Sequence, residues 1–392
     1  MNGLVRTLAD VTVVDLTQGV AGPLTSRNLA SMGARIIKVE RPGVGDIIRH
    51  WDTLVSGHSS GHVWVNPGKE SIEVDLGSER GREIVNRLLD KPNTVLIHNF
   101  VPGTIEKFKL DYDTVRVGRP GLIYCSISGY GERGEYRSRN AIDLIIQGES
   151  GILLTNGTHE HPAKLSLSVC DIAGSCNATI GILEALVHRE RTGEGQKIEI
   201  SLLESILSWS GYFPYMVWYQ DTLPKRVGLH HHTMAPYGPY RSSDDRQVIL
   251  AAGSGERNLW VRFCTALGHP ELIDDPRYDS NGARLEHRAD LDAIVSKAIG
   301  SRPAEKWIDI FTAHDVPCGL VRDLREGLDH PAMREVGAVR EIGSSIGPVR
   351  LLNSPIHSTV ANHTIERGPA VLGEHTAAIL QEIGLSGAGG AS

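Results

Sequence analysis

The sequence predicts an α/β fold built on a largely parallel sheet. Short apolar runs of strand type alternate with helical patterns over the first half of the chain, and the first repeat is a strand, a glycine-containing turn, a helix and a strand. After Trp209 the composition changes to a stretch rich in Trp, Tyr and Phe. Alternation of this kind is typical of parallel sheets with helices on their faces. At 392 residues the chain is long enough for this sheet and a second, smaller domain.

The elements follow in order from the first repeat. A buried strand is expected over 11–16, a helix over 24–32 and a second strand over 34–40. Further strands are expected within 66–76, 94–100, 121–131 and 165–170 and from about 196, most of them followed by a helical pattern. The first turn, GVAGP, lacks the third glycine of G-x-G-x-x-G, so it is no dinucleotide fingerprint.

The domain boundaries follow from these changes of pattern. We expect the large domain over 1–210, a linker over 211–224, a small domain over 225–330, a return to the large domain over 331–386 and a disordered tail over 387–392. The closing helical pattern starts near Gly373.

Charge and cysteine content narrow the partners and the compartment. The net charge is −7 and the sequence pI is near 6.2, with no long run of one sign, so neither nucleic acid nor a membrane surface is implied. We expect small-molecule partners instead. The five cysteines are scattered, and no apolar run approaches the roughly 18 residues of a membrane span. These features favour the cytoplasm.

One acidic residue, Asp171, lies where the strand expected over 165–170 gives way to a helical pattern. It has two interpretations. As a helix N-cap its carboxylate accepts amide hydrogens of the first turn, which is worth about 1 kcal/mol. As a nucleophile or base it lies beyond the carboxyl edge of the sheet, where open α/β folds bind their ligands.

Eight segments together resemble family III CoA-transferases, the group of formyl-CoA transferase and carnitine CoA-transferase that also contains α-methylacyl-CoA racemase. They are VVDLTQGVAGP, GARIIKVERPGVGD, NPGKESIEVDL, HNFVPGTIEKFKLDY, ISGYGERG, the Asp171 segment, HRERTGEGQKIEISLLES and PAVLGEHT. The resemblance covers nearly the whole chain and is strongest to the branch acting on C4–C5 dicarboxylic acids. It implies a Rossmann-like large domain built from both chain ends, a smaller α+β domain and an interlocked homodimer.

The resemblance also implies an activity. Asp171 would attack an acyl-CoA, such as succinyl-CoA or a similar dicarboxylyl-CoA, to form an aspartyl anhydride and then an aspartyl-CoA thioester. CoA would pass from there to a small carboxylic acid. No metal and no permanently bound cofactor is expected, since CoA enters as part of the substrate. Two alternatives are an α-methylacyl-CoA racemase and a CoA-binding protein without turnover.

The positions matching the family's CoA contacts share no single residue type. They are Val20, Ala21, Arg41, Val74, Asn99, Phe100, Lys107 and one or both of Arg139 and Asn140. Arg41 is the best candidate to contact a phosphate group or the adenine of CoA. The alternative interpretation is that Arg41 is a solvated charge before a turn. Lys107 stands where some relatives have Arg, which keeps the charge and loses the planar fork.

A second acidic residue, Asp143, matches a position near the family's reacting centre. It would orient the acyl group or the Asp171 helix, or else it caps its own helix. The racemases carry a His immediately before this acid, whereas this chain has Ile142.

Substrate contacts are expected in the second half of the chain. An Arg and a His before T-x-A-P-Y-G recur in relatives handling dicarboxylic acids, so Arg226 with His231 or His232 would hold a distal carboxylate. Three adjacent His point to alternate faces when extended, so a structural loop is a better interpretation than a metal site. Gly253 and Gly255 match a glycine-rich loop that closes over the intermediates, and an ordinary hairpin turn is the alternative.

Overall fold

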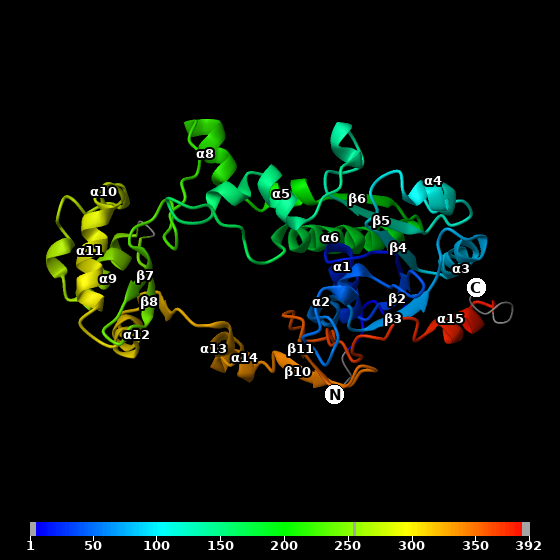
Figure 1. The fold of residues 1–392 in the computed structure, drawn as a ribbon. Coiled ribbons are helices and arrows are strands. Elements are labelled where there is room, and N and C mark those ends of the chain that lie inside the picture. Colours follow the sequence, from blue (N-terminus) through cyan, green and yellow to red (C-terminus); the bar gives the residue numbers. More distant parts are fainter. Residues whose placement is uncertain (1–4, 254–255, 386–392) are drawn as a thin grey trace. The chain divides into compact units, whose positions relative to one another are not determined.

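The computed structural model describes residues 5–253 and 256–385, which form two compact units (Figure 1). The large unit comprises the described parts of 1–153, 164–211 and 331–392, and the small unit comprises 154–163 and 212–330. The described residues nearest to either end of the chain therefore belong to the large unit. The predicted tail over 387–392 lies outside the described residues.

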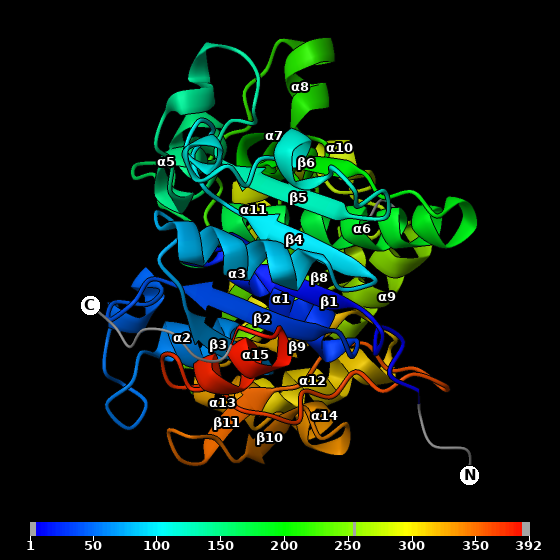
Figure 2. The ribbon, with the colours of Figure 1, turned by 90° about the vertical axis from the view of Figure 1, so that its right-hand side faces the viewer.

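A six-stranded parallel sheet forms the centre of the large unit, in the order β3-β2-β1-β4-β5-β6 (Figure 2). Its strands in chain order are β1 Thr12–Asp15, β2 Arg35–Glu40, β3 Lys69–Glu73, β4 Thr94–His98, β5 Ile123–Ser128 and β6 Lys197–Ser201. The pairing is in register at the centre, where Val13 faces Ile36 on one side and Val95 on the other. The chain reverses direction across the sheet between β1 and β4, and such a switch point is where doubly wound folds bind ligands.

Helices cover both faces of this sheet because successive strand residues point to opposite sides. Val13 packs in the core under α1 (Ala21–Ser31) and α6 (Val169–Thr192), whereas Val14 packs under α3 (Glu79–Leu89) and α15 (Thr376–Glu382). The remaining elements are η1 Ile47–His50, α2 Ser60–Val65, η2 Ile105–Phe108, α4 Tyr112–Val115, η3 Glu135–Ser138, α5 Asp143–Glu149, η4 Ile152–Thr155, α7 Leu202–Ser208, α14 Pro331–Glu335, β10 Val339–Ile342 and β11 Val349–Leu352.

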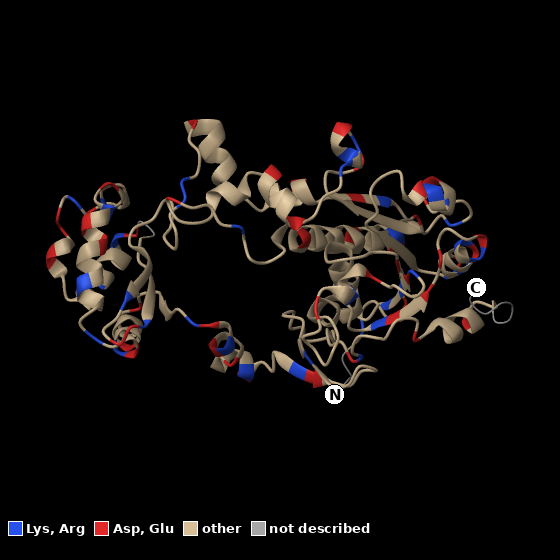
Figure 3. Cartoon of the chain, in the orientation of Figure 1, with Lys and Arg blue, Asp and Glu red and all other residues tan. Residues whose placement is uncertain are grey.

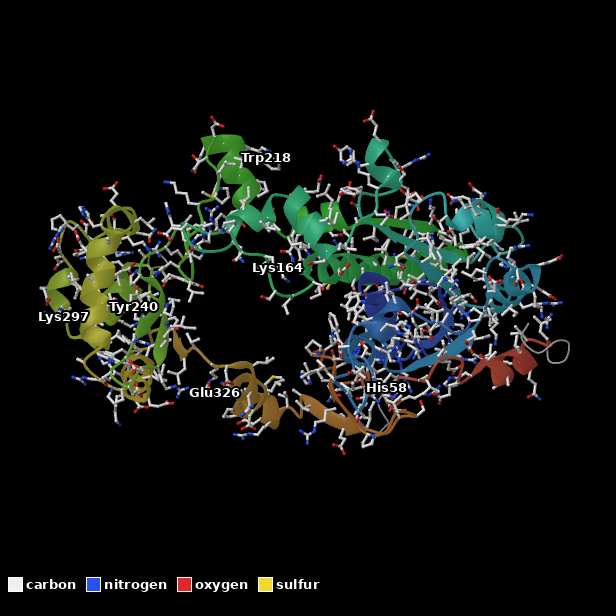
Figure 4. All side chains as sticks on the ribbon, in the orientation of Figure 1. His58, Lys164, Trp218, Tyr240, Lys297 and Glu326 are labelled. Carbon is white, nitrogen blue, oxygen red and sulfur yellow. The ribbon has the colours of Figure 1, made fainter. Side chains whose placement is uncertain are left out.

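The small unit has its own core. Its antiparallel sheet has the order β7-β8-β9. The strands are Tyr237–Arg241, Gln247–Ala251 and Cys318–Leu320, and the helices are α8 Phe213–Gln220, α9 Arg257–Leu267, η5 Pro270–Leu272, α10 Asn281–Glu286, α11 Arg288–Ile299, α12 Ala304–Ala313 and α13 Leu324–Leu328. Stacked aromatic rings of α9 and α12 fill its centre. Tyr240, labelled in Figure 4, joins β7 to α11 through a 2.6 Å hydrogen bond to Asp292.

The mixed α/β class and the parallel sheet predicted from sequence are confirmed. The strand expected over 165–170 is wrong, because 165–168 form neither strand nor helix and α6 already begins at Val169. The helix expected after β4 is reduced to the 3-10 turn η2. The predicted linker over 211–224 contains α8.

One described helix, α6, is long and apolar enough to cross a membrane by length and composition alone. The expectation that no segment approaches such a length was therefore wrong for this helix. Its packing explains the composition, because α6 lies against α1, β5 and the edge strand β6 in the core of the large unit. Basic and acidic side chains are interspersed over the elements of both units (Figure 3).

Candidate active site

A cavity of about 320 Å³ opens at the carboxyl ends of four neighbouring strands of the large unit. It is lined by Leu16, Gln18, Val39, Glu40, Arg41, Val74, Asp75, Leu76, Gly77, Phe100 and Phe108. These residues lie at or after the ends of β1, β2, β3 and β4, so parallel strand ends bring together segments that are distant in sequence. Three predicted CoA contacts, Arg41, Val74 and Phe100, meet in this cavity.

The loop after β1 borders the cavity and is held by side chains from other strands. Asn99, which follows β4, accepts a hydrogen bond from the Gln18 amide at 2.9 Å and donates to the Gln18 carbonyl at 2.7 Å. The amide of Gly19 donates to Asp46 at 2.9 Å. Asn99 therefore fixes the backbone at the mouth of the cavity.

A buried ion cluster, consisting of Asp15, Lys38, Asp46 and Lys69, lies beneath this loop. Lys38 pairs with Asp46 at 2.8 Å and donates to the carbonyl of Thr17 at 2.8 Å. The two side chains of this pair thus hold both Thr17 and Gly19. Burial alone would lower the pKa of Lys38, but the carboxylates of Asp46 and Asp15 keep it above its usual range.

The other half of the cluster holds the start of α1. Lys69 contacts Asp15 at 3.1 Å and donates to the carbonyl of Pro23 at 2.8 Å, while Ser26 also donates to Asp15. Burial would raise the pKa of Asp15, but the two lysines and the hydroxyl groups of Ser26 and Thr17 keep it well below its usual range. Burial lowers the pKa of Lys69 to about 8 in spite of its pairing with Asp15.

The remaining predicted CoA contacts are distributed unevenly. Val20 and Ala21 are buried at the start of α1. Lys107 is exposed on η2, next to the cavity residue Phe108. Arg139 and Asn140 are exposed and do not line the cavity, and the Arg139 guanidinium lies 3.7 Å over the ring of Tyr136.

Asp171 is the third residue of α6 and is partly buried. It is not the N-cap, which is Ser168. Its neighbour Ile172 packs against the cluster that contains Val20 and Leu24, at the start of the helix that follows the cavity loop. Burial, and next the negative charge of Asp143, raise the pKa of Asp171 to about 7. The partial positive charge of a helix N-terminus would lower the pKa of Asp171. Burial and the charge of Asp143 together outweigh this effect.

Asp143 is the first residue of α5, and its own helix has no side-chain cap. One carboxylate oxygen accepts a hydrogen bond from the Cys170 amide at 2.8 Å, and the other accepts one from the Gln147 side chain at 2.7 Å. Asp143 therefore satisfies an amide of the first turn of α6, one residue before Asp171. Asp143 therefore does not cap its own helix and instead contacts the helix that carries Asp171.

In the small unit, Arg226 donates to the carbonyl oxygens of Thr158 and His159 at 2.9 and 3.0 Å. A longer bond to the Leu154 carbonyl at 3.5 Å engages the third nitrogen atom, so all three are occupied. His231 is partly buried, and burial followed by the charges of His232 and Arg288 lowers its pKa. No group of three or more potential metal-binding His, Cys, Asp or Glu residues occurs among residues 5–253 and 256–385.

Gly253 lies two residues after β8, where a Cβ atom would come within 2.4 Å of the Ala235 amide nitrogen. Any side chain there would displace the segment that follows the three histidines. Gly255 lies outside the described residues.

Comparisons with known proteins decide the family. The sequence model described as CoA-transferase family III matches residues 8–376. The chain belongs to CoA-transferase family III. It is 30% identical to human succinyl-CoA:glutarate CoA-transferase, covering 97% of this chain and 86% of the relative. It is 33% identical to succinyl-CoA:mesaconate CoA-transferase of Haloarcula hispanica, covering 96% of each chain.

A solved structure agrees with this assignment. The crystal structure of a CAIB/BAIF family protein from Brucella suis superposes with a TM-score of 0.83 at 32% identity, covering 96% of this chain and 99% of the other. The resemblance stated from the motifs is thereby confirmed, and this family III CoA-transferase is an enzyme that transfers CoA. Enzymes of this type act on CoA thioesters.

Sequence reasoning missed several residues that shape the site. Gln18 lines the cavity, the buried ion cluster supports the cavity loop, and Gln147 contacts Asp143. A signal existed for Lys38, because a lysine in the middle of the apolar run RIIKVE must be paired if the strand is buried. Gln147 gave no comparable signal, since a single Gln in a helical pattern is ordinary on a surface.

Proposed function

We propose that this enzyme moves CoA from succinyl-CoA, or a similar dicarboxylyl-CoA, to a small carboxylic acid through covalent intermediates on Asp171. The observation that carries the proposal is a partly buried carboxyl group with its pKa raised to about 7, one residue from a side chain packed on the start of α1. A carboxylate of that basicity is a stronger nucleophile than an ordinary surface Asp and is still substantially ionised near neutral pH.

The reaction divides into balanced displacements. A carboxylate oxygen of Asp171 attacks the thioester carbonyl, the C–S bond breaks, and CoA leaves as a thiolate while an anhydride forms. The thiolate attacks the aspartyl carbonyl, which releases the donor acid and leaves an aspartyl-CoA thioester. The acceptor carboxylate then repeats these two steps in reverse and regenerates Asp171. No step consumes a proton, so no separate acid or base is required.

The surroundings of Asp171 favour these intermediates. Burial and the charge of Asp143 both penalise the ionised carboxylate. Acylation of Asp171 removes its charge and therefore relieves both penalties at once. The causes that raise the pKa thus also stabilise the neutral anhydride and thioester relative to the free enzyme.

CoA itself is proposed to occupy the cavity at the strand ends. Arg41 is exposed at its edge, where its guanidinium is available to a phosphate, and Phe100 and Val74 provide apolar walls. Val20, Ala21 and Asn99 are proposed to shape the path toward Asp171. Lys107, Arg139 and Asn140 are proposed as contacts outside the cavity. No other cofactor is proposed.

The acceptor is proposed to be a dicarboxylic acid. The relatives described above are named for glutarate and mesaconate, and both use succinyl-CoA. Its distal carboxylate is assigned to His231 and His232, because Arg226 already donates to three carbonyl oxygens. The loop that contains Gly253 is proposed to close over the intermediates.

Two chains are proposed to form an interlocked homodimer. Each unit exposes large apolar side chains, including Ile180 and Val187 on α6 and Trp218 and Tyr219 on α8, and Trp218 is 71% exposed (Figure 4). Exposed apolar surface of this kind marks interfaces. Light scattering at micromolar concentration should give the mass of two chains, and a folded monomer would contradict the proposal. The five free cysteines fit a reducing compartment, and we propose the cytoplasm.

One incubation tests the activity. The enzyme is mixed in deuterated water with succinyl-CoA, a panel of acids including glutarate and mesaconate, and a 2-methylacyl-CoA, and all CoA thioesters are analysed by mass spectrometry. We expect new thioesters that carry no deuterium, and none with Asp171→Asn. Deuterium at the α-carbon of the 2-methylacyl-CoA without transfer would instead establish a racemase. Binding of CoA without either reaction would contradict both.

A further inference from the structure

The side chain of Gln147 is fully buried, with 0% exposure, on the inner face of α5. Its amide nitrogen donates to the Asp143 carboxylate at 2.7 Å and to the Leu165 carbonyl at 3.2 Å. Its amide oxygen accepts a hydrogen bond from the Leu165 amide at 2.9 Å. One buried side chain therefore joins the Asp143 carboxylate to the segment that precedes Asp171.

The first of these contacts fixes a charge. Gln147 donates to one oxygen of Asp143 and the Cys170 amide donates to the other, so both oxygens and hence the plane of the carboxylate are set. Gln147 lies four residues after Asp143 on α5, one helical turn away. Without Gln147 as donor, one Asp143 oxygen would lose its hydrogen bond, and the carboxylate could rotate about its side-chain torsions.

The second contact fixes a backbone segment without regular structure. Residues 165–168 form neither helix nor strand, yet Leu165 has both its backbone groups paired with the amide of Gln147. Lys164, labelled in Figure 4, begins this segment. Because α6 starts at Val169, the position of Leu165 determines how the chain enters the first turn that carries Asp171.

We propose that Gln147 is a positioning residue for the reacting centre, holding the Asp143 carboxylate against the first turn of α6 and fixing the backbone that leads into Asp171. Gln147 does not touch the substrate in this account. Its effect on turnover rests on the function proposed above for Asp171. Its effect on the backbone does not, and the two effects are measured separately.

The backbone effect is tested by hydrogen–deuterium exchange of the enzyme without substrate. Gln147→Met keeps the length of the side chain and removes its hydrogen bonds. We expect amides of the peptide 164–171 to exchange at least about tenfold faster in this variant, because local opening becomes easier. The control is Ile146→Val on the same helix, which removes a buried methylene and touches neither Asp143 nor Leu165 in the polar network. Unchanged exchange of this peptide in Gln147→Met, or equal acceleration in the control, would overturn the proposal.

The effect on turnover is tested by the same variants under steady-state conditions. We expect Gln147→Met to lower kcat about 30-fold with KM for succinyl-CoA changed less than about twofold, since small misplacements of reacting groups cost rate and not CoA binding. A merely structural role would lower the active fraction and leave KM and the kcat per folded enzyme unchanged.

A double-mutant cycle decides whether Gln147 acts through Asp143. Asp143→Ala removes the carboxylate that Gln147 holds, so adding Gln147→Met should lower kcat by much less than it does in the wild type. Fully additive losses would contradict action through Asp143. If wild-type enzyme transferred no CoA at all, the proposed function would fall, and the exchange experiment would still decide the role of Gln147 in positioning α6.

Discussion

The large unit contains two groups of buried or partly buried carboxylates whose environments shift the carboxyl pKa in opposite directions. In the ion cluster beneath the cavity loop, lysines hold the pKa of Asp15 well below its usual range. At the start of α6, Asp171 has a carboxylate as its charged neighbour and its pKa rises to about 7. Burial penalises both charges, and the sign of the neighbouring charge decides the outcome.

This difference separates a structural role from a chemical one. A carboxylate fixed in its ionised form by lysines supports a loop over the whole working pH range. A carboxylate that gains from losing its charge is suited to become an anhydride or a thioester. The predictions below therefore alter one region at a time, with activity, stability and pH dependence as readouts.

The largest effect is expected for the proposed nucleophile, Asp171. Asp171→Asn should lower the transfer rate by at least about 10³-fold, because an amide cannot form the covalent intermediates. Calorimetric binding of CoA should remain within about threefold, since the cavity is formed by the ends of β1 to β4. Glu184→Gln, an exposed acid on the same helix, is the matched control. Substantial transfer by Asp171→Asn would refute the nucleophile assignment.

Breaking the ion cluster should mainly affect stability. Lys38→Met leaves Asp46 buried without its partner at 2.8 Å, which should lower the free energy of unfolding by about 3–5 kcal/mol. Urea unfolding measures this, with Glu83→Gln as the control. That residue forms an exposed pair with Arg80 and should cost less than about 1 kcal/mol. A loss below 1 kcal/mol in Lys38→Met would show that the cluster is not what holds the loop.

Removing the exposed cation of the cavity should affect binding alone. Arg41→Ala should raise KM for succinyl-CoA about tenfold with kcat within about twofold, as expected for one charge-assisted hydrogen bond to a phosphate. Initial rates over a range of CoA thioester concentrations measure both constants. Arg116→Ala, an exposed arginine outside the cavity, should leave both unchanged. An unchanged KM in Arg41→Ala would exclude Arg41 from the CoA site.

Removing the like charge should shift the pH dependence. In the wild type, kcat/KM should fall as pH drops below about 7, because Asp171 must be ionised to react. Asp143→Asn removes the repulsion between the two carboxylates and leaves the burial of Asp171 unchanged. The pH below which kcat/KM falls should therefore decrease, while staying above the usual pKa of an Asp side chain. If kcat/KM fell at the same pH in Asp143→Asn as in the wild type, the charge of Asp143 would have no part in raising the pKa of Asp171.

The smallest effect concerns stability at the reacting centre. Because the folded-state pKa of Asp171 is above its unfolded value, the folded state binds more protons between about pH 4 and 7, and its contribution to stability is lost as pH rises through 7. Asp171→Asn should therefore be more stable than the wild type at pH 8. Equal or lower stability would contradict the penalty on the ionised carboxylate.

The sequence predicted the cavity more successfully than the surroundings of Asp171. Apolar runs locate the strands, and parallel strand ends meet at one edge, so residues that follow strands, such as Arg41, Val74 and Phe100, come together. The segment 165–170 alternates like a strand, but alternation does not supply a partner strand. Gln147 pairs with Leu165 instead.

Contacts between distant residues explain the other omissions. Asp143 accepts a hydrogen bond from the amide of Cys170, which lies 27 residues later in the chain. Lys69 donates to Asp15, which lies 54 residues earlier. Such pairs arise only once helices and strands are packed, so residue spacing along the chain does not reveal them. The role of Asp171 as a helix cap was a reasonable alternative from sequence, and only the start of α6 at Val169 removes it.

The most direct test of the account is to trap the covalent intermediate on the enzyme. Enzyme incubated with succinyl-CoA is quenched with hydroxylamine, digested and analysed by tandem mass spectrometry, since hydroxylamine converts an acyl anhydride or thioester of an aspartate to a hydroxamate. We expect a hydroxamate on Asp171 that requires both succinyl-CoA and hydroxylamine and is absent from Asp171→Asn. CoA transfer with Asp171 unmodified, or with the adduct on another residue, would contradict it.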